Sequence, residues 1–160
     1  MTQKIFISST LILLVLGAIL WNQVFQSNPD TETATKKDLE ITMYRADGCN
    51  CCIKWSDYLI TEGFTVNEQL VGNLSEIKSD KNIPSELESC HTATIDGYVV
   101  EGHVPAEDIR RLVSEQPDAI GISVPKMPMG SPGMEGPRED PYNVILFGDA
   151  GNHTIYARYP

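Results

Sequence analysis

The sequence predicts an α/β domain in which strands and helices alternate along the chain. Two observations indicate this class. Residues 39–44 alternate apolar and polar side chains with the two-residue period of a half-buried strand, whereas residues 49–62 place apolar side chains on one face at helical spacing. Further stretches of both kinds follow, separated by glycine, proline and asparagine, which end helices and form turns. Strands and helices therefore occur in turn rather than in separate blocks.

Each element of the first half has its own signal. Residues 39–44 form the first predicted strand. No residue from 49 to 62 breaks a helix, and Gly63 is a good residue to end one. Residues 64–71 outline a second strand, and residues 74–81 predict a short helix before a proline.

A hairpin and a third helix complete the predicted core. The Asp-Gly pair at 96–97 is a strong turn signal between strands at 92–95 and 98–100. Pro105 stands where a first helical residue is tolerated, and residues 106–116 carry one apolar face. The resulting β-α-β-α-β-β-α order matches the thioredoxin-like arrangement.

The C-terminal part adds a loop and a hairpin to this core. Residues 121–141 are rich in proline and glycine, carry three methionines and predict a long ordered loop. Residues 142–147 and 153–159, joined by a turn at 149–152, predict a closing β-hairpin. The predicted fold is therefore a thioredoxin-like core with an added Pro/Gly/Met-rich loop and a C-terminal β-hairpin.

Composition limits the number of domains and the partners. The chain has 160 residues, 12 Lys plus Arg and 22 Asp plus Glu, and a formal net charge of −10. This length favours one working domain once any targeting segment is subtracted. Nucleic-acid binding depends on a surplus of Lys and Arg, so the negative charge argues against a nucleic-acid partner.

The N-terminal residues predict export. Lys4 precedes an uncharged, mostly apolar run at residues 5–21, which is at the lower edge of the ~17–25 residues that span a bilayer. Residues 1–27 therefore predict either a signal peptide or an N-terminal membrane anchor, and residues 28–38 a polar tether. The positive charge before the run places the rest of the chain outside the cytosol. The expected location is periplasmic or extracytoplasmic, either released after cleavage or anchored in the inner membrane, with residues 39–160 as the working domain.

Three cysteines at the start of the predicted helix carry the chemistry. Cys49 and Cys52 have the C-x-x-C spacing of thiol-disulfide enzymes, whereas Cys51 adds a thiol that such enzymes do not need. The positive end of a helix stabilises thiolates, and thiolates both attack disulfides and bind metals. Thiolates select soft ions such as Cu(I), while structural zinc usually takes paired ligands from two separate knuckles. The cluster therefore favours a soft metal ion.

A fourth cysteine completes the candidate site. In a thioredoxin-like chain the loop before the third strand packs against the redox motif, and Cys90 falls in that loop. Four convergent thiolates could hold several copper ions through bridging sulfurs; the alternative is that Cys90 is a small buried apolar residue. His153 is expected to be structural. Further candidate ligands, which supply imidazole nitrogen or thioether sulfur, are His91, His103, Met127, Met129 and Met134.

The chain resembles a known family in five blocks of sequence. These are YRADGCNCCIKW at 44–55, ESCH at 88–91, DGYVVEGHVP at 96–105, IRR at 109–111 and VPKMPMGSPGME at 124–135. Together they resemble the CopG-like copper-resistance proteins of bacteria, long catalogued as a domain of unknown function. One departure is Asn50, where a glycine is common; asparagine also tolerates left-handed backbone angles.

The resemblance implies a periplasmic, thioredoxin-like protein of copper resistance. Its copper ligands would be Cys49, Cys51, Cys52 and Cys90, and its partners would be copper ions and periplasmic proteins that donate or accept copper. It also implies a copper oxidoreductase that interconverts Cu(I) and Cu(II), although binding follows more directly from the residues than turnover does.

Two other hypotheses remain open from the residues alone. The main alternative is a thiol-disulfide oxidoreductase that uses Cys49 and Cys52, with Cys51 and Cys90 as resolving or structural thiols. Gly48 before the motif, and a cysteine in place of the usual proline at position 90, weigh against it. The weakest hypothesis is that two disulfides merely brace a small secreted domain, because bonds between near neighbours constrain the unfolded chain little.

Overall fold

The computed structural model describes residues 39–160. The predicted signal peptide or anchor at 1–27 and the tether at 28–38 lie outside the described residues and stay predictions. Within residues 39–160, no helix is both long enough and apolar enough to cross a membrane.

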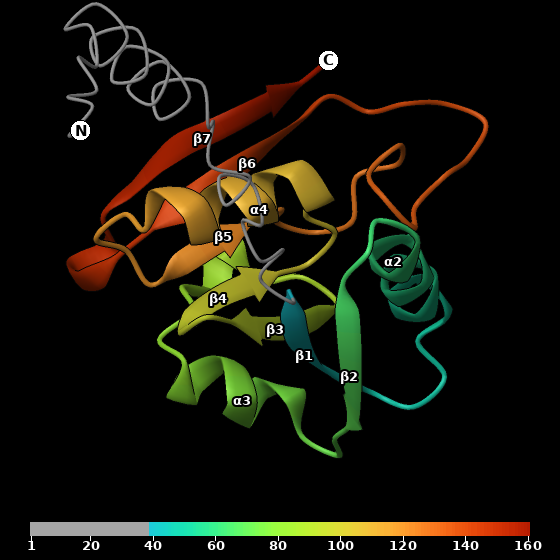
Figure 1. The fold of residues 1–160 in the computed structure, drawn as a ribbon, viewed down its shortest axis with the longest axis horizontal. Coiled ribbons are helices and arrows are strands. Elements are labelled where there is room, and N and C mark those ends of the chain that lie inside the picture. The colour runs from blue at the N-terminus through green and yellow to red at the C-terminus, as the bar shows by residue number, and fades with distance from the viewer. Residues whose placement is uncertain (1–38) are drawn as a thin grey trace, which may run out of the picture. The chain divides into compact units, whose positions relative to one another are not determined.

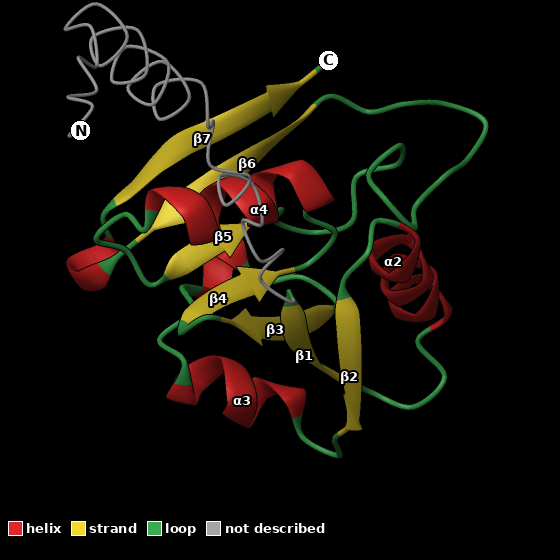
Figure 2. Ribbon diagram, viewed as in Figure 1, coloured by secondary structure: helices red, strands yellow, loops and turns green. Residues whose placement is uncertain are grey.

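The described chain has a mixed α/β fold built on one seven-stranded sheet (Figures 1 and 2). Two single-turn 3-10 helices occur at Ser85–Leu87 and Asp149–Gly151. The helices and strands, in chain order, are β1 (Glu40–Arg45), α2 (Asn50–Thr61), β2 (Thr65–Leu70), α3 (Leu74–Asp80), β3 (His91–Ile95), β4 (Tyr98–Glu101), α4 (Ala106–Glu115), β5 (Gly121–Ser123), β6 (Tyr142–Phe147) and β7 (His153–Tyr159).

The strand order of the sheet is β2-β1-β3-β4-β5-β6-β7. Strand β1 runs parallel to β2 and antiparallel to β3, with Arg45 opposite His91. The last residue of β1 therefore lies beside the first residue of β3. Because α2 follows β1 after a short turn and Cys90 immediately precedes β3, both cysteine-bearing segments lie at the same end of the sheet.

The sequence predictions for the core are confirmed at the level of element order. From β1 to α4 the elements follow the predicted β-α-β-α-β-β-α order, and β6 and β7 form the predicted hairpin. Pro105 differs slightly from expectation, because it lies just before α4 in an extended conformation (φ −62°, ψ 142°) rather than as its first helical residue.

The region predicted as one long loop contains a strand. Residues 121–123 form β5, which pairs parallel with β4 and antiparallel with β6. Three residues within a Pro/Gly-rich stretch are too few to show a strand period. Strand β5 joins the closing hairpin to the core sheet and makes one continuous seven-stranded sheet.

The core packs apolar helix faces against the sheet. Trp55 and Leu59 of α2 and Ile109 and Leu112 of α4 are fully buried in one cluster with sheet residues. The indole nitrogen of Trp55 donates a hydrogen bond to the Val104 carbonyl at 2.9 Å. This anchor fixes the position of the first turn of α2, which carries the cysteines.

Candidate metal and thiol site

The first turn of α2 presents three cysteines at its N-terminus. A turn with Gly48 in the left-handed region (φ +73°) redirects the chain after β1. Cys49 occupies the N-cap position of α2, but no side chain at this position accepts a hydrogen bond from the free N–H groups of the first turn. These amides and the positive end of the helix favour negative charge on nearby sulfurs.

The four cysteine sulfurs converge. Cys49 and Cys52 form a disulfide, and Cys51 and Cys90 are free thiols. The Sγ of Cys51 lies 3.6 Å from that of Cys49 and 3.7 Å from that of Cys90. The Sγ of Cys52 also lies 3.7 Å from that of Cys90. The predicted approach of Cys90 to the helix N-terminus is therefore what the structure shows.

Two histidines extend the cluster beyond Cys90. The Sγ of Cys90 lies 3.0 Å from Nε2 of His103 and 3.3 Å from Nδ1 of His91. All four cysteine sulfurs lie within 4.8 Å of one another, and so do the ligand atoms of Cys90, His91 and His103. Cys90 belongs to both groups, so the two groups form one continuous candidate site.

Neighbouring groups orient both imidazole rings. Nδ1 of His103 lies 2.8 Å from the Pro132 carbonyl oxygen, which accepts its hydrogen bond. The His91 ring lies against Trp55, with ring centroids 4.4 Å apart, and meets the His103 ring edge-on at 5.0 Å. No group of the described chain meets Nε2 of His91 in hydrogen-bonding geometry.

Burial favours the neutral forms of Cys90, His91 and His103. Burial, together with the neighbouring Cys51, raises the pKa of the Cys90 thiol to about 12. Burial, with the charges of His103 and Lys78, holds the pKa of His91 well below its usual value, although the Gly102 backbone opposes this shift. Burial also lowers the pKa of His103, against the effects of the Pro132 carbonyl and Glu135. Neutral imidazoles are the form that binds metals.

The Pro/Gly/Met-rich loop lies directly on α2. Gly133 has a φ of +82°, and a Cβ there would lie 2.8 Å from the backbone nitrogen of Trp55 and 3.0 Å from the Cys51 carbonyl oxygen. The carbonyl of the neighbouring Pro132 accepts a hydrogen bond from His103, so this part of the loop covers the helix turn that bears the cysteines. Proximity of this kind requires a residue without a side chain.

The three loop methionines occupy different environments. Met127 is 48% exposed. Met129 is half-buried, and its sulfur lies against Gly136, where a Cβ would be only 2.5 Å away. Met134 is half-buried in a tight turn whose backbone bonds join it to Gly130 and Ser131. Their proposed role as copper ligands stays a prediction. His153 is exposed in β7 and lies outside both ligand groups.

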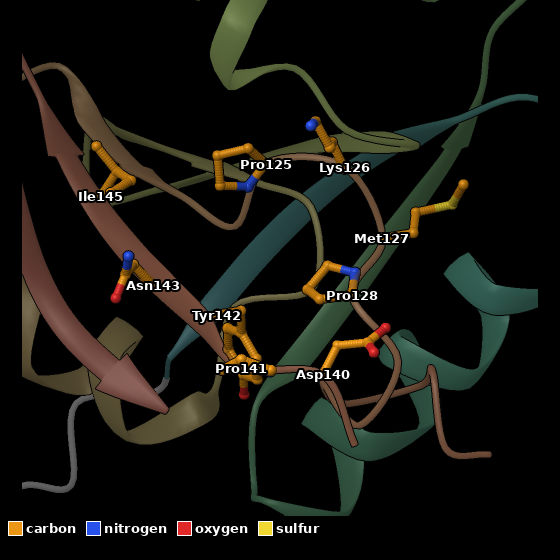
Figure 3. A pocket seen from close by; sticks show the side chains of 9 residues that line it. All are labelled: Pro125, Lys126, Met127, Pro128, Asp140, Pro141, Tyr142, Asn143 and Ile145. Carbon is orange, nitrogen blue, oxygen red and sulfur yellow. The ribbon is translucent and has the colours of Figure 1, made fainter. Parts of the chain in front are cut away.

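An open cavity lies between the Pro/Gly/Met-rich loop and the start of β6 (Figure 3). Its volume is about 480 Å³, and no cysteine lines it. Figure 3 shows Met127 extending away from Tyr142 and Ile145. The backbone of Lys126 bonds to Glu88 and Ser89, so the cavity wall joins the segment before Cys90. The lining residues are Pro125, Lys126, Met127, Pro128, Asp140, Pro141, Tyr142, Asn143 and Ile145.

Sequence reasoning did not identify two features of this site. The first is the Pro132 carbonyl, whose role depends only on backbone placement. The second is a buried ion pair of Lys78 and Glu101 behind Cys90. The available signal for Glu101 was its position directly after the apolar run 98–100, where a strand could bury it. Charged side chains are rarely buried without a partner, so a buried Glu101 would imply a paired cation.

The described fold and site define an α/β protein with a cysteine-rich site suited to a soft metal ion or to thiol redox chemistry. A family model described as "Protein of unknown function, DUF411" matches residues 87–134. Two solved structures titled "Copper resistance protein copG", in Form 2 and Form 1, are each 43% identical to the chain with a TM-score of 0.74. Each alignment covers 78% of this chain, and 100% and 99% of the respective structures. No curated protein matches the chain. The chain belongs to the CopG-like family of copper-resistance proteins.

Proposed function

We propose that this protein is an exported copper-binding protein of copper resistance that holds Cu(I) through Cys49, Cys51, Cys52 and Cys90. The observation that carries the proposal is the convergence of four sulfurs within 4.8 Å of one another. Cysteine thiolates are soft ligands that select Cu(I). The copper-resistance titles of the two solved relatives support copper as the metal.

The spacing of the sulfurs favours more than one copper ion. Cys90 lies 3.7 Å from both Cys51 and Cys52, so its sulfur can bridge ions held by different cysteines. His103 and His91 supply nitrogen ligands on the other side of Cys90. Met127, Met129 and Met134 are candidates for weaker thioether contacts from the covering loop.

The disulfide relates this site to redox chemistry. Two of the four thiolates are unavailable while Cys49 and Cys52 are bonded, so the four-thiolate site requires the reduced pair. When the dithiol closes the disulfide it releases two electrons and two protons, which is sufficient to reduce two Cu(II) ions to Cu(I). Interconversion of Cu(I) and Cu(II) by this pair is the enzymatic part of the proposal.

The same proposal places the protein outside the cytosol. It also assigns a thioredoxin-like fold to the working domain. The order of elements from β1 to α4 and the cysteines at the start of α2 support the thioredoxin-like part. The sequence of residues 1–27 supports export, either with cleavage or with retention in the inner membrane. Periplasmic proteins that donate or accept copper are the corresponding partners.

An anaerobic Cu(I) titration against a chromophoric competitor tests the proposal. Reduced wild-type protein and the Cys51→Ser and Cys90→Ser variants are compared. We expect tight binding in the wild type and weaker binding in both variants. Wild-type affinity in both variants would exclude the four-cysteine site.

A second candidate function is thiol-disulfide exchange by Cys49 and Cys52, and the disulfide between them favours it. The discriminating measurement is the rate at which the reduced protein reduces a disulfide substrate. The oxidoreductase function is the correct one under two conditions. The wild type must reduce the disulfide substrate without binding copper, and the Cys51→Ser and Cys90→Ser variants must reduce the substrate as fast as the wild type does.

A further inference from the structure

A buried ion pair lies behind the segment that carries Cys90. Lys78 of α3 and Glu101 of β4 form this pair, and their side chains are 5% and 0% exposed. The hydroxyl of Thr92 in β3 donates a hydrogen bond to Oε2 of Glu101 at 2.7 Å and accepts one from Nζ of Lys78 at 3.1 Å. The three side chains form a closed polar network between a helix and two strands.

Glu101 also holds the backbone next to Cys90. The backbone N–H of Ser89 donates a hydrogen bond to Oε1 of Glu101 at 2.6 Å. Gly102 also packs closely against Ser89, since a Cβ at Gly102 would lie 2.5 Å from both Cβ and Oγ of Ser89. Ser89 is therefore held by the carboxylate and packed against Gly102, and these contacts limit the movement of the adjacent Cys90.

The network borders the histidines as well. Thr92 directly follows His91, and Glu101 lies two residues before His103. Backbone pairing joins the same segments, because the Gly102 N–H donates a hydrogen bond to the His91 carbonyl at 3.0 Å. One carboxylate thus connects the backbone segments that bear Cys90, His91 and His103.

Stability alone does not explain a buried ion pair. Removing two charges from water costs free energy that their attraction often fails to recover, and well-packed apolar residues of similar volume are frequently as stable. An apolar pair could not accept the Ser89 N–H, however. What the carboxylate adds is a fixed acceptor, which defines where the Ser89 backbone lies.

We propose that Glu101, held in place by Lys78, is a positioning residue that sets the location of Cys90 relative to the cysteines of α2. This inference rests on the proposed copper site and adds a determinant of its geometry. Residues that orient metal ligands typically change metal affinity by 10–100-fold when they are replaced.

Two double variants separate positioning from charge and stability. Lys78→Met with Glu101→Gln removes both charges but keeps a side-chain oxygen that can accept the Ser89 N–H. Lys78→Met with Glu101→Leu removes both charges and also the acceptor. Neither variant leaves an unpaired buried ammonium, so both are expected to fold. Asp108→Asn serves as a control because it alters a buried carboxylate of α4 whose partners are Arg111 and Tyr159.

The first readout needs no metal. In the reduced, metal-free protein, peptide mapping measures the alkylation rate of Cys90. We expect the Leu-containing variant to react at least about threefold faster than the Gln-containing variant, which should resemble the wild type, as should the Asp108→Asn control. The second readout is the Cu(I) dissociation constant, expected to rise about tenfold or more only in the Leu-containing variant, with a changed Cu(I)-thiolate absorption spectrum.

Equal alkylation rates and equal copper affinities in the two double variants would overturn the positioning role. If the wild type binds no Cu(I), the proposed copper function fails, and the alkylation comparison still decides whether Glu101 positions Cys90. A loss of copper affinity that also occurs in Asp108→Asn at equal loss of stability would assign the effect to general destabilisation and overturn the inference.

Discussion

The sulfur of Cys90 lies 3.0 Å from Nε2 of His103. The opposite nitrogen of the same ring, Nδ1, lies 2.8 Å from the Pro132 carbonyl oxygen. A carbonyl oxygen only accepts hydrogen bonds, so the ring hydrogen lies on Nδ1 and Nε2 keeps its lone pair. The Cys90 thiol therefore donates to Nε2 in the metal-free protein, and the same lone pair is available to a metal ion once the thiol proton is lost.

Replacing Cys90 should weaken copper binding strongly, because Cys90 is the one cysteine that belongs to both ligand groups. Partners outside the ligand set typically contribute 10–100-fold to metal affinity, so loss of a bridging ligand in Cys90→Ser should raise the Cu(I) dissociation constant by at least about 100-fold. A competitor titration measures this change. Unchanged affinity in Cys90→Ser would show that Cys90 is not a ligand.

Replacing His103 should have a smaller but specific effect. In His103→Leu the nitrogen next to Cys90 is lost, while the four thiols remain, and we expect about a tenfold loss of Cu(I) affinity. X-ray absorption should show the loss of a nitrogen ligand. His153→Leu is the matched control, because His153 lies outside both ligand groups. Equal spectra for the two variants would contradict ligation by His103.

Copper affinity should depend on pH through Cys90. Because burial and Cys51 raise the pKa of this thiol to about 12, the thiol is protonated in the metal-free protein near neutral pH, and Cu(I) must displace its proton. Each unit of decreasing pH should therefore weaken binding about tenfold through this group alone. The Cys90→Ser variant should lose one proton from the slope of log Kd against pH between pH 6 and 8. An identical slope would contradict the prediction.

The stability of the metal-free protein should fall in mild acid through His91. Burial keeps the pKa of His91 well below its usual value of 6.5, so below that pH the unfolded chain takes up a proton that the folded chain does not. The free energy of unfolding should then decrease by as much as about 1.4 kcal/mol per pH unit from this group. Urea unfolding from pH 7 to 5 measures it, and His91→Gln should show a shallower decrease. Parallel curves for the two proteins would contradict the assignment.

Replacing Gly133 should open the cover over the cysteines. Residue 133 has a φ of +82°, and Gly133→Ala places a Cβ there 2.8 Å from the backbone nitrogen of Trp55, so the loop must move away from α2. Gly97→Ala is the matched control, because its φ of +87° brings similar backbone strain but nothing lies within 4 Å. Strain alone should cost about 1–3 kcal/mol in each variant. Only Gly133→Ala should speed alkylation of Cys51, and equal rates would show that the loop does not cover the site.

Local patterns were sufficient for most of the secondary structure. The absence of helix breakers from 49 to 62 predicted α2, and the Asp-Gly pair at 96–97 predicted the hairpin of β3 and β4. Both signals act within a few residues, so the sequence displays them directly. Strand β5 escaped prediction because its pairing with β4 and β6, rather than its own three residues, defines it.

The candidate site was predictable where its residues are adjacent in the chain. Cys49, Cys51 and Cys52 share one helical turn, and their chemistry follows from residue type and from the helix N-terminus. The approach of Cys90 could be anticipated only through an assumed fold. The Lys78–Glu101 pair could not be, because neither residue has a local pattern that names its partner.

The order of residues thus predicted most of the helices and strands and the cysteine-bearing turn, and it favoured a soft metal at that turn, since these inferences depend on short-range periodicity and on side-chain chemistry. Tertiary structure alone decided that Cys90 meets both the α2 cysteines and His103, that Pro132 orients the imidazole, and that Glu101 holds Ser89. These contacts join residues far apart in the chain. Their geometry arises only when β1 pairs with β3 and the loop packs on α2.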